Sequence, residues 1–339
     1  MLLERGDLSL THGNPVYILL LINLARRTGG APKQRKKVSP KPMTGEVEIP
    51  QPPTITESQL ARCRETGDYR PLLFEWYKYV GTLSNFYSCI RSDSAAVRSL
   101  PTLHYATLVG LLNRCSRLIL ANVALSHKGL FGETTAILDR CIFESAVKVI
   151  WLCTKGDDES FSRFIADGLK TELEFKKKIE KNISDRGGTI LAIEKRMLTS
   201  ISNYVSCSGL TEPQIESAKK LPDMAAMIDV IGRDRLLYVV GQKIGSHHVH
   251  GTWPSLWLHY LDEQDGMLGP RDHDCPTHVN QYVFVPLLVL QAVDAFVRFI
   301  CTDQRDARPM SELLDSVRDE ILRFYVEVVG DDFEHIKEI

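Results

Sequence analysis

Hydrophobic side chains recur along most of this 339-residue chain at the 3.6-residue period of an α-helix. The clearest stretch is 103–127. One face of that helix would carry Leu108, Leu111, Leu112, Cys115, Leu118, Ile119 and Val123. The same period, with polar caps, Gly and Pro as end signals, predicts the other helices. Their expected spans are 56–91, 133–154, 157–182, 189–204, 211–220, 224–231, 234–250, 277–301 and 310–329.

The pattern also indicates what lies between these helices. Strand-length alternation of apolar and polar residues is absent, and no internal repeat is visible. The stretch 251–276 is rich in Gly, Pro, Asp and His, so it is expected to be a long loop. The sequence therefore predicts an all-α protein, a bundle of about 8–10 helices.

Two apolar segments must be distinguished from membrane spans. The segment 283–300 approaches span length, but Gln291, Asp294 and Arg298 fall inside it. Each charge at mid-bilayer would cost roughly a few kcal/mol, so a buried core helix is expected. Val16–Leu24 is only about a third to a half of a span, and basic residues rather than a cleavage site follow it. We therefore expect no membrane partner and no secretion.

Charge divides the chain unevenly. Residues 1–45 carry 8 basic and 2 acidic side chains, whereas the remainder carries 33 basic and 41 acidic ones. The Pro-rich, basic stretch predicts a disordered N-terminal arm over 1–55, followed by one helical domain over 56–330. The arm is either a plain linker, a segment that binds nucleic acid or another anionic surface, or an untranslated leader with the start at Met43.

Composition and motifs exclude several classes. With 44% hydrophobic and 25% charged residues, the chain is neither disordered throughout nor collagen-like. Its eight cysteines form no C-x-x-C pair, and most lie in apolar helical patterns, which predicts reduced thiols and a cytoplasmic location. Signatures of dinucleotide sites, phosphate loops, serine hydrolases and zinc proteases are missing. The sequence implies no cofactor.

Two groups of residues are candidates for a functional site. Arg140 and Glu144 stand four residues apart on an otherwise apolar helix face, so they form either a structural ion pair or part of a polar pocket. Six of the ten histidines lie between His247 and His278. For these histidines, together with Asp274 and Cys275, three interpretations are open: metal ligands, acid–base or RNA-contacting groups, or structural residues. Their spacing matches no standard zinc site.

These residues carry a family resemblance. R-C-I-F-E at Arg140–Glu144 and S-H-H-V-H at Ser246–His250 resemble motifs of DUF5677, a mostly bacterial family without an established activity, over about residues 70–302. The resemblance implies an all-α fold. More remotely, the chain is similar to HEPN-type helical domains, many of which are metal-independent RNases of toxin and antiphage systems that act as dimers. A homodimer is therefore expected. The family's arginine is missing here, because its position falls on Lys243 or Gln242, and lysine lacks the bidentate fork of arginine.

Three functions follow as hypotheses. The first is a non-catalytic or weakly catalytic interaction or sensor module, with a protein partner, linked to antiphage or toxin-type systems. The second is an RNase in which His250 is the general acid/base, Lys243 and Arg140 stabilise phosphate charge, and Glu144 orients Arg140, with Ser246 in the polar turn. The third is a His-rich metal-binding protein.

Overall fold

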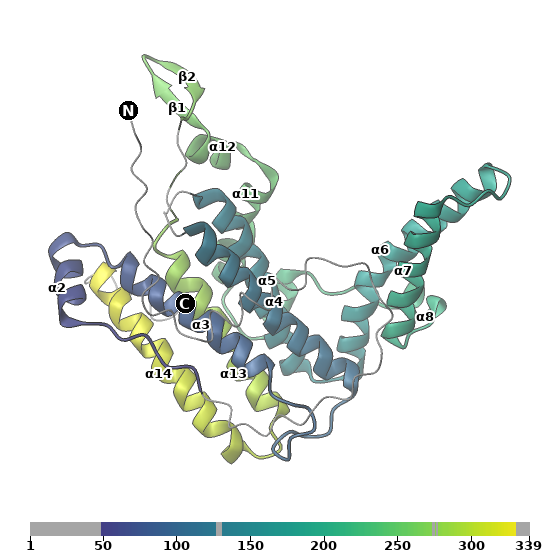
Figure 1. Ribbon diagram of the computed structural model, residues 1–339, viewed down its shortest axis with the longest axis horizontal. Coiled ribbons are helices and arrows are strands. Elements are labelled where there is room, and N and C mark those ends of the chain that lie inside the picture. The colour runs from purple at the N-terminus through teal and green to yellow at the C-terminus, as the bar shows by residue number, and fades with distance from the viewer. Residues whose placement is uncertain (1–48, 127–130, 273–274, 276, 330–339) are drawn as a thin grey trace, which may run out of the picture. The chain divides into compact units, whose positions relative to one another are not determined.

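The computed structural model describes residues 49–126, 131–272, 275 and 277–329 of the chain. Four long helices build the main core, and Figure 1 shows them alongside one another. They are α3 (Arg70–Ser88), α4 (Thr102–Ser126), α5 (Gly132–Lys155) and α13 (Gln281–Ile300). A fifth helix, α14 (Gln304–Val329), packs against α3 and α13. The all-α prediction is confirmed, and the predicted arm lies outside the described residues except for 49–55.

The core follows from the apolar periodicity. Leu108 and Leu112, one turn apart on α4, are fully buried, and so are Leu83 of α3 and Val147 of α5 in the same core cluster. Each such side chain contributes roughly 1.5–3 kcal/mol by leaving water. Helices α4 and α13 are long and apolar enough to cross a membrane by length and composition, which is weak evidence for a span. In the structure α13 is a core helix, as expected.

The first predicted helix, 56–91, is wrong as a single element. Thr56 and Gln59 form the expected capping box at the start of α2 (Glu57–Thr66). That helix ends at Gly67, whose φ of 67° lies in the left-handed region that favours glycine. Helix α3 then begins afresh with Pro71 in its first turn, where a missing N–H costs nothing.

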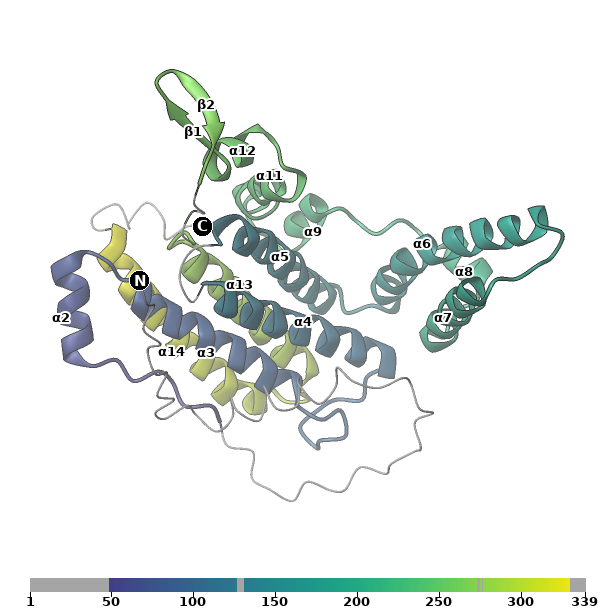
Figure 2. The same cartoon turned by 45° about the horizontal axis from the view of Figure 1, so that its top comes forward.

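A second, smaller cluster forms between α6 (Asp158–Asp185), α7 (Ala192–Ser208) and α8 (Glu212–Ser217), which lie side by side in Figure 2. Its buried residues are Ala166, Leu169, Leu173 and Ile215. Ion pairs on its surface join α6 to α8, with 2.6 Å between Lys176 Nζ and Glu212 Oε1. The charged stretch of α6 is therefore a solvated face, as its composition suggested.

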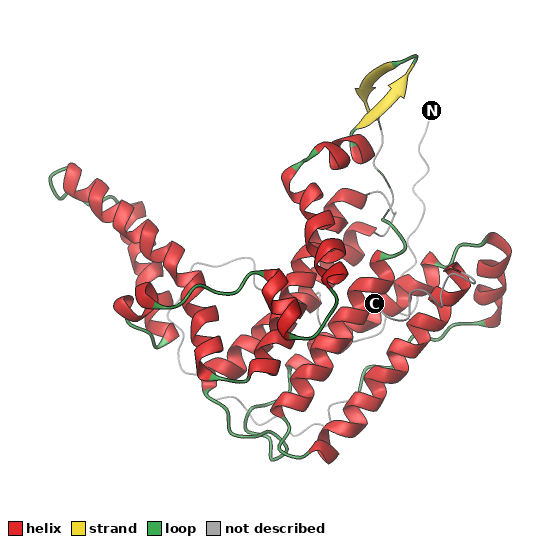
Figure 3. Ribbon diagram, turned by 180° about the vertical axis from the view of Figure 1, so that it is seen from behind, coloured by secondary structure: helices red, strands yellow, loops and turns green. Residues whose placement is uncertain are grey.

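The remaining elements follow one another closely in sequence. They are α9 (Met224–Val230), α10 (Arg235–Tyr238), the π-helix η1 (Val239–Ile244), α11 (Gly245–His250), α12 (Trp253–His259), β1 (Leu261–Gln264) and β2 (Met267–Pro270). Helices α10, η1 and α11 follow one another without a break, so the helix expected over 234–250 is present with a π-helical middle segment. The strands, yellow in Figure 3, pair antiparallel with Leu261 opposite Pro270.

The long loop expected at 251–276 is therefore wrong over much of its length. Thr252 and Pro254 start α12, in the same way that Thr211 and Pro213 start α8. The hairpin turns at Asp265 and Gly266, whose φ values of 53° and 75° are both positive. An Asp-Gly turn of this kind matches the twist of two short strands. Four-residue strands are too short to show a readable alternation.

A buried polar network ties α3, α4 and α5 together. Asn122 Nδ2 donates to Asp139 Oδ1 at 2.5 Å and to Tyr77 Oη at 2.8 Å, and Tyr77 Oη donates to Asp139 Oδ1 at 3.3 Å. Burial raises the pKa of Asp139 well above its ordinary value, although both hydrogen bonds act in the other direction. Burial therefore favours the neutral form of Asp139, and its hydrogen bonds join α3, α4 and α5.

Candidate functional site

A polar face of α5 meets η1, α11 and α12, and it contains most of the residues singled out from the sequence. Glu133, Arg140 and Glu144 follow at spacings of seven and four residues, which places them on one side of the helix. Arg140 Nη2 lies 3.1 Å from Glu144 Oε1, and their side chains are 18% and 27% exposed. Lys148 Nζ lies 3.9 Å from the other carboxylate oxygen of Glu144. The predicted pair is thus a largely shielded ion pair.

Two glycines allow η1 and α11 to approach this face closely. A methyl group at Gly241 would overlap the ring of Phe143. A methyl group at Gly245 would lie 3.2 Å from Arg140 Cβ. The R-C-I-F-E segment therefore packs directly against the turn that carries Gly245 and Ser246. The site lies beside a π-helix, a widened turn that is frequent at functional positions.

The other predicted site residues divide between the interior and the surface. Ser246 Oγ donates to the backbone oxygen of Gln242 at 2.6 Å, so its hydroxyl is committed to the helix. Lys243 is exposed, with its Nζ 5.6 Å from the centre of the Tyr238 ring. His250 is exposed at the end of α11. Among the described residues, neither Lys243 nor His250 is hydrogen-bonded or ion-paired to Arg140 or Glu144.

Three buried polar atoms at this interface have no hydrogen-bond partner among the described residues. They are Arg140 Nε, Gln242 Oε1 and His248 Nδ1. A buried polar group without a partner costs roughly 1–3 kcal/mol. The contact between α5 and the η1–α11 segment therefore carries a polar cost that the surrounding apolar packing must offset.

A second polar cluster lies where α12 meets the first turn of α5. The carboxylate of Glu133 accepts hydrogen bonds from the hydroxyls of Ser255 and Tyr260. The His248 and His259 rings stand edge to face with centres 5.1 Å apart. Burial lowers the pKa of His248, and the neighbouring His259 acts in the same direction, whereas Glu133 opposes it. At neutral pH His248 is therefore held as an uncharged, packed ring.

The sequence did not identify this second cluster. In the sequence, Glu133 is only the first residue of the expected helix 133–154, and Ser255 lies within the expected loop 251–276. The usable signal was the four-residue spacing of Ser255 and His259, which places both on one face of a short helix. Two of the clustered histidines, His248 and His259, thus pack against each other beside the first turn of α5.

The metal hypothesis finds no donor set in the described part of the chain. There, no group of three or more His, Cys, Asp and Glu side chains could hold a metal ion. Cys275 Sγ donates to the backbone oxygen of Leu258 at 3.1 Å, and His278 Nδ1 accepts from the backbone of Asn280 at 3.2 Å. His273 and Asp274 lie outside the described residues.

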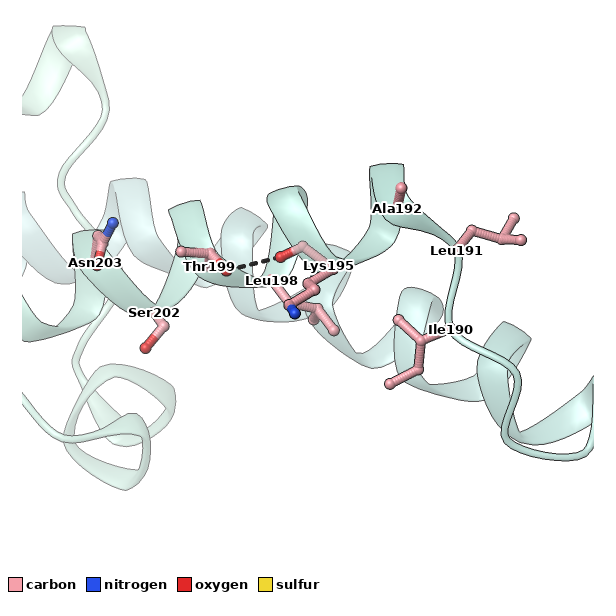
Figure 4. Close-up of a pocket in the computed structure, with 8 residues that line it drawn as sticks. All are labelled: Ile190, Leu191, Ala192, Lys195, Leu198, Thr199, Ser202 and Asn203. Carbon is pink, nitrogen blue, oxygen red and sulfur yellow. Dashed lines mark hydrogen bonds between the residues drawn. The ribbon is translucent and has the colours of Figure 1, made fainter. Parts of the chain in front are cut away.

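Two of the hollows in the structure lie away from this face. One, of about 630 Å³, follows the start of α7, and Figure 4 shows it lined by side chains including Lys195 and Ser202. The other, of about 340 Å³, lies between the Gly67–Arg70 turn and Thr277–Val279. Neither of these two hollows is lined by Arg140, Glu144 or His250.

Helix α12 shows the most unusual distribution of side chains. Its inner residues are polar, since Ser255 is 0% and His259 7% exposed. Its outer stripe is apolar, since Trp253 is 59%, Trp257 45% and Leu256 38% exposed. The Trp253 and Trp257 rings lie 5.8 Å apart. The spacing i, i+3, i+4 is that of a core-facing helix, yet no other element among the described residues covers this face.

Comparison with known proteins yields one result. Residues 105–268 match the model of DUF5677, a family of unknown function, which confirms the resemblance over just under half of the chain. The matched segment runs from α4 to the hairpin, so it contains both the α5 face and α12. No curated protein and no solved structure matches the chain.

Proposed function

We propose that this protein is a helical interaction module whose binding surface is the outer face of α12 together with the segments beside it. The observation that carries the proposal is the reversed polarity of α12, with Ser255 and His259 inside and Trp253 and Trp257 outside. Exposed apolar patches beyond a few hundred Å² mark association surfaces in soluble proteins. Tryptophan is also enriched among the residues that dominate binding energy at interfaces.

The hydrogen bonds and ion pair on the polar face of α5 also support this proposal. Arg140 is paired with Glu144, Ser246 bonds to its own helix, and Glu133 is engaged by two hydroxyls. Of these contacts, those of Glu133 join two elements, because Ser255 and Tyr260 fasten α12 to the first turn of α5. They hold α12 in place, and the apolar residues on its outer side are available to a protein partner.

Photo-cross-linking in the cells that make the protein tests this proposal. A photoreactive amino acid at position 257 should give discrete protein adducts, and adding Leu256→Asp should remove them by disrupting the stripe. The matched control is position 204 on α7, where Tyr204 is 55% exposed but lies outside this surface. Absence of adducts at 257, or the same adducts at 204, would overturn the proposal.

A second candidate is an RNase of the HEPN-like type. It is supported by the packing of Arg140 against Gly245, which brings the two motif segments side by side. In this hypothesis His250 is the general acid/base, Lys243 and Arg140 stabilise phosphate charge, Glu144 orients Arg140, and Ser246 belongs to the polar turn. Purified protein should then cleave labelled RNA, and His250→Ala should abolish cleavage while His278→Ala should not. Equal cleavage by all three proteins would exclude the hypothesis.

A further inference from the structure

Three apolar features lie close together in sequence between residues 236 and 268. The first is the α12 stripe. The second is a stripe on α10 and η1 formed by Leu236, Val240 and Ile244, which are 43%, 42% and 49% exposed. The third is the hairpin, where Met267 is 72% and Leu268 49% exposed. We call these together the apolar surface of 236–268.

The stripe on α10 and η1 faces away from the bundle. Leu237 and Gly241, which follow Leu236 and Val240 in the sequence, are buried. The opposite side of α10 and η1 therefore faces the core. The hairpin also lacks cover within the described part of the chain, where its strands pair with each other and pack against α12. A lone two-stranded hairpin is marginally stable in water.

Charge divides this surface into two complementary parts. The hairpin carries Glu263 and Asp265, which have no ion pair among the described residues, beside Asp262, which lies 3.0 Å from Arg271. The helical part carries Arg235 and Lys243, also without an ion pair in the described residues. An acidic, apolar hairpin and a basic, apolar helix stripe on one chain are complementary to each other.

We propose that the partner of this surface is a second copy of the chain, with the hairpin of each copy covering the α10–η1 stripe of the other. The proposal rests on the proposed function, and it names the partner of that same surface. In a two-fold dimer each contact occurs twice, so one acidic hairpin and one basic stripe per chain satisfy both halves.

The size of the surface agrees with this arrangement. Taking about 100 Å² for each half-exposed large side chain, the apolar surface of 236–268 amounts to the order of 1,000 Å² per chain. A standard stable interface buries about 800 Å² on each partner. The α12 stripe, with its two tryptophans, supplies the aromatic anchors that such an interface requires.

Sedimentation velocity on the purified full chain, over a wide range of concentration, tests this. The wild-type chain should sediment at twice the chain mass. Lys243→Glu and Glu263→Lys should each shift the protein to the monomer, because each places like charges across the interface. Carrying both substitutions in one chain should restore the dimer. Lys181→Glu, the same change at an exposed position on α6, is the matched control and should leave the dimer intact.

Leu256→Asp extends the test to the α12 stripe and should give a monomer, whereas Ile193→Asp, at an exposed leucine-sized position on α7, should not. Circular dichroism establishes that each variant is folded. A wild-type chain that is monomeric at every concentration overturns the dimer. If position 257 then cross-links to a different protein, the proposed function stands and only the identity of the partner is wrong.

Discussion

The four-helix core and the segment 235–270 use apolar side chains in opposite ways. In α5, Trp151 and Phe143 are each 1% exposed, whereas in α12 Trp253 is 59% exposed and Ser255 is fully buried. Both helices are amphipathic, so their composition does not distinguish them. The difference is the direction of the apolar face, toward the chain's own core in α5 and toward solvent in α12. We infer that the first region provides stability and the second provides association.

Core truncation gives the largest expected contrast. Phe143→Ala should lower the free energy of unfolding by about 3–5 kcal/mol, because it removes a buried ring and leaves a cavity. Trp253→Ala, at a solvent-facing position, should change it by less than about 0.5 kcal/mol. Urea unfolding followed by circular dichroism measures both. Similar losses for the two variants would show that α12 is part of the folding core.

The close contact of η1 with α5 comes next. Gly241→Ala should destabilise the protein by about 1–3 kcal/mol, because the added methyl group overlaps the Phe143 ring. Gly110→Ala is the matched control, since a methyl group there meets nothing within 4 Å. It should stabilise helix α4 by about 0.5–1 kcal/mol. If Gly241→Ala proved neutral, the approach of η1 to α5 would be looser than described.

The buried carboxyl of Asp139 should make stability depend on pH. Its folded-state pKa is raised by burial, so the stability that it contributes is complete below the unfolded-state pKa of about 4 and is lost as pH rises toward the folded-state value. The slope approaches a loss of about 1.4 kcal/mol per pH unit in that window. Asp139→Asn, which is neutral at every pH, should remove this slope.

Urea unfolding at pH 5 and pH 7 compares the two proteins. The wild type should lose more stability than Asp139→Asn between these pH values. A surface carboxylate such as Asp185, changed in the same way, provides the control and should leave the wild-type slope unchanged. Parallel pH profiles for the wild type and Asp139→Asn would show that Asp139 is ionised in the folded protein.

The smallest effect is expected for the ion pair of Arg140 and Glu144. A double-mutant cycle with Arg140→Met and Glu144→Gln should give a coupling energy of about 0.5–1 kcal/mol, since the pair is shielded but still reached by water. Each single variant should leave the self-association of the chain unchanged. Loss of the dimer in either variant would extend the interface to the face of α5.

Several elements were predictable from the sequence because their signals are local. The capping box at Thr56 and the 3.6-residue period of α4 act within one helix, and both predictions hold. The split at Gly67 was missed because a single glycine inside an apolar pattern is tolerated in many helices. The hairpin was missed although Asp265–Gly266 is a turn signal, because its strands are only four residues long.

The candidate site was predictable only in part. The spacing of Arg140 and Glu144 implied their pairing, which the structure shows at 3.1 Å. The cluster of Glu133 with Ser255 joins residues 122 positions apart, and no local pattern predicts such a contact. The orientation of α12 was equally hidden, because periodicity reveals an apolar face without revealing what that face contacts.

By itself, the sequence determined that the chain is helical, where most helices lie, and that Arg140 and Glu144 share a helix face. Those properties depend on backbone preference and on side chains a few residues apart. Only the tertiary structure decided that Asp139 is buried in a polar network, that glycines bring η1 against α5, and that α12 faces outward. Those properties depend on contacts between distant segments, whose free energies exist only after the helices have packed.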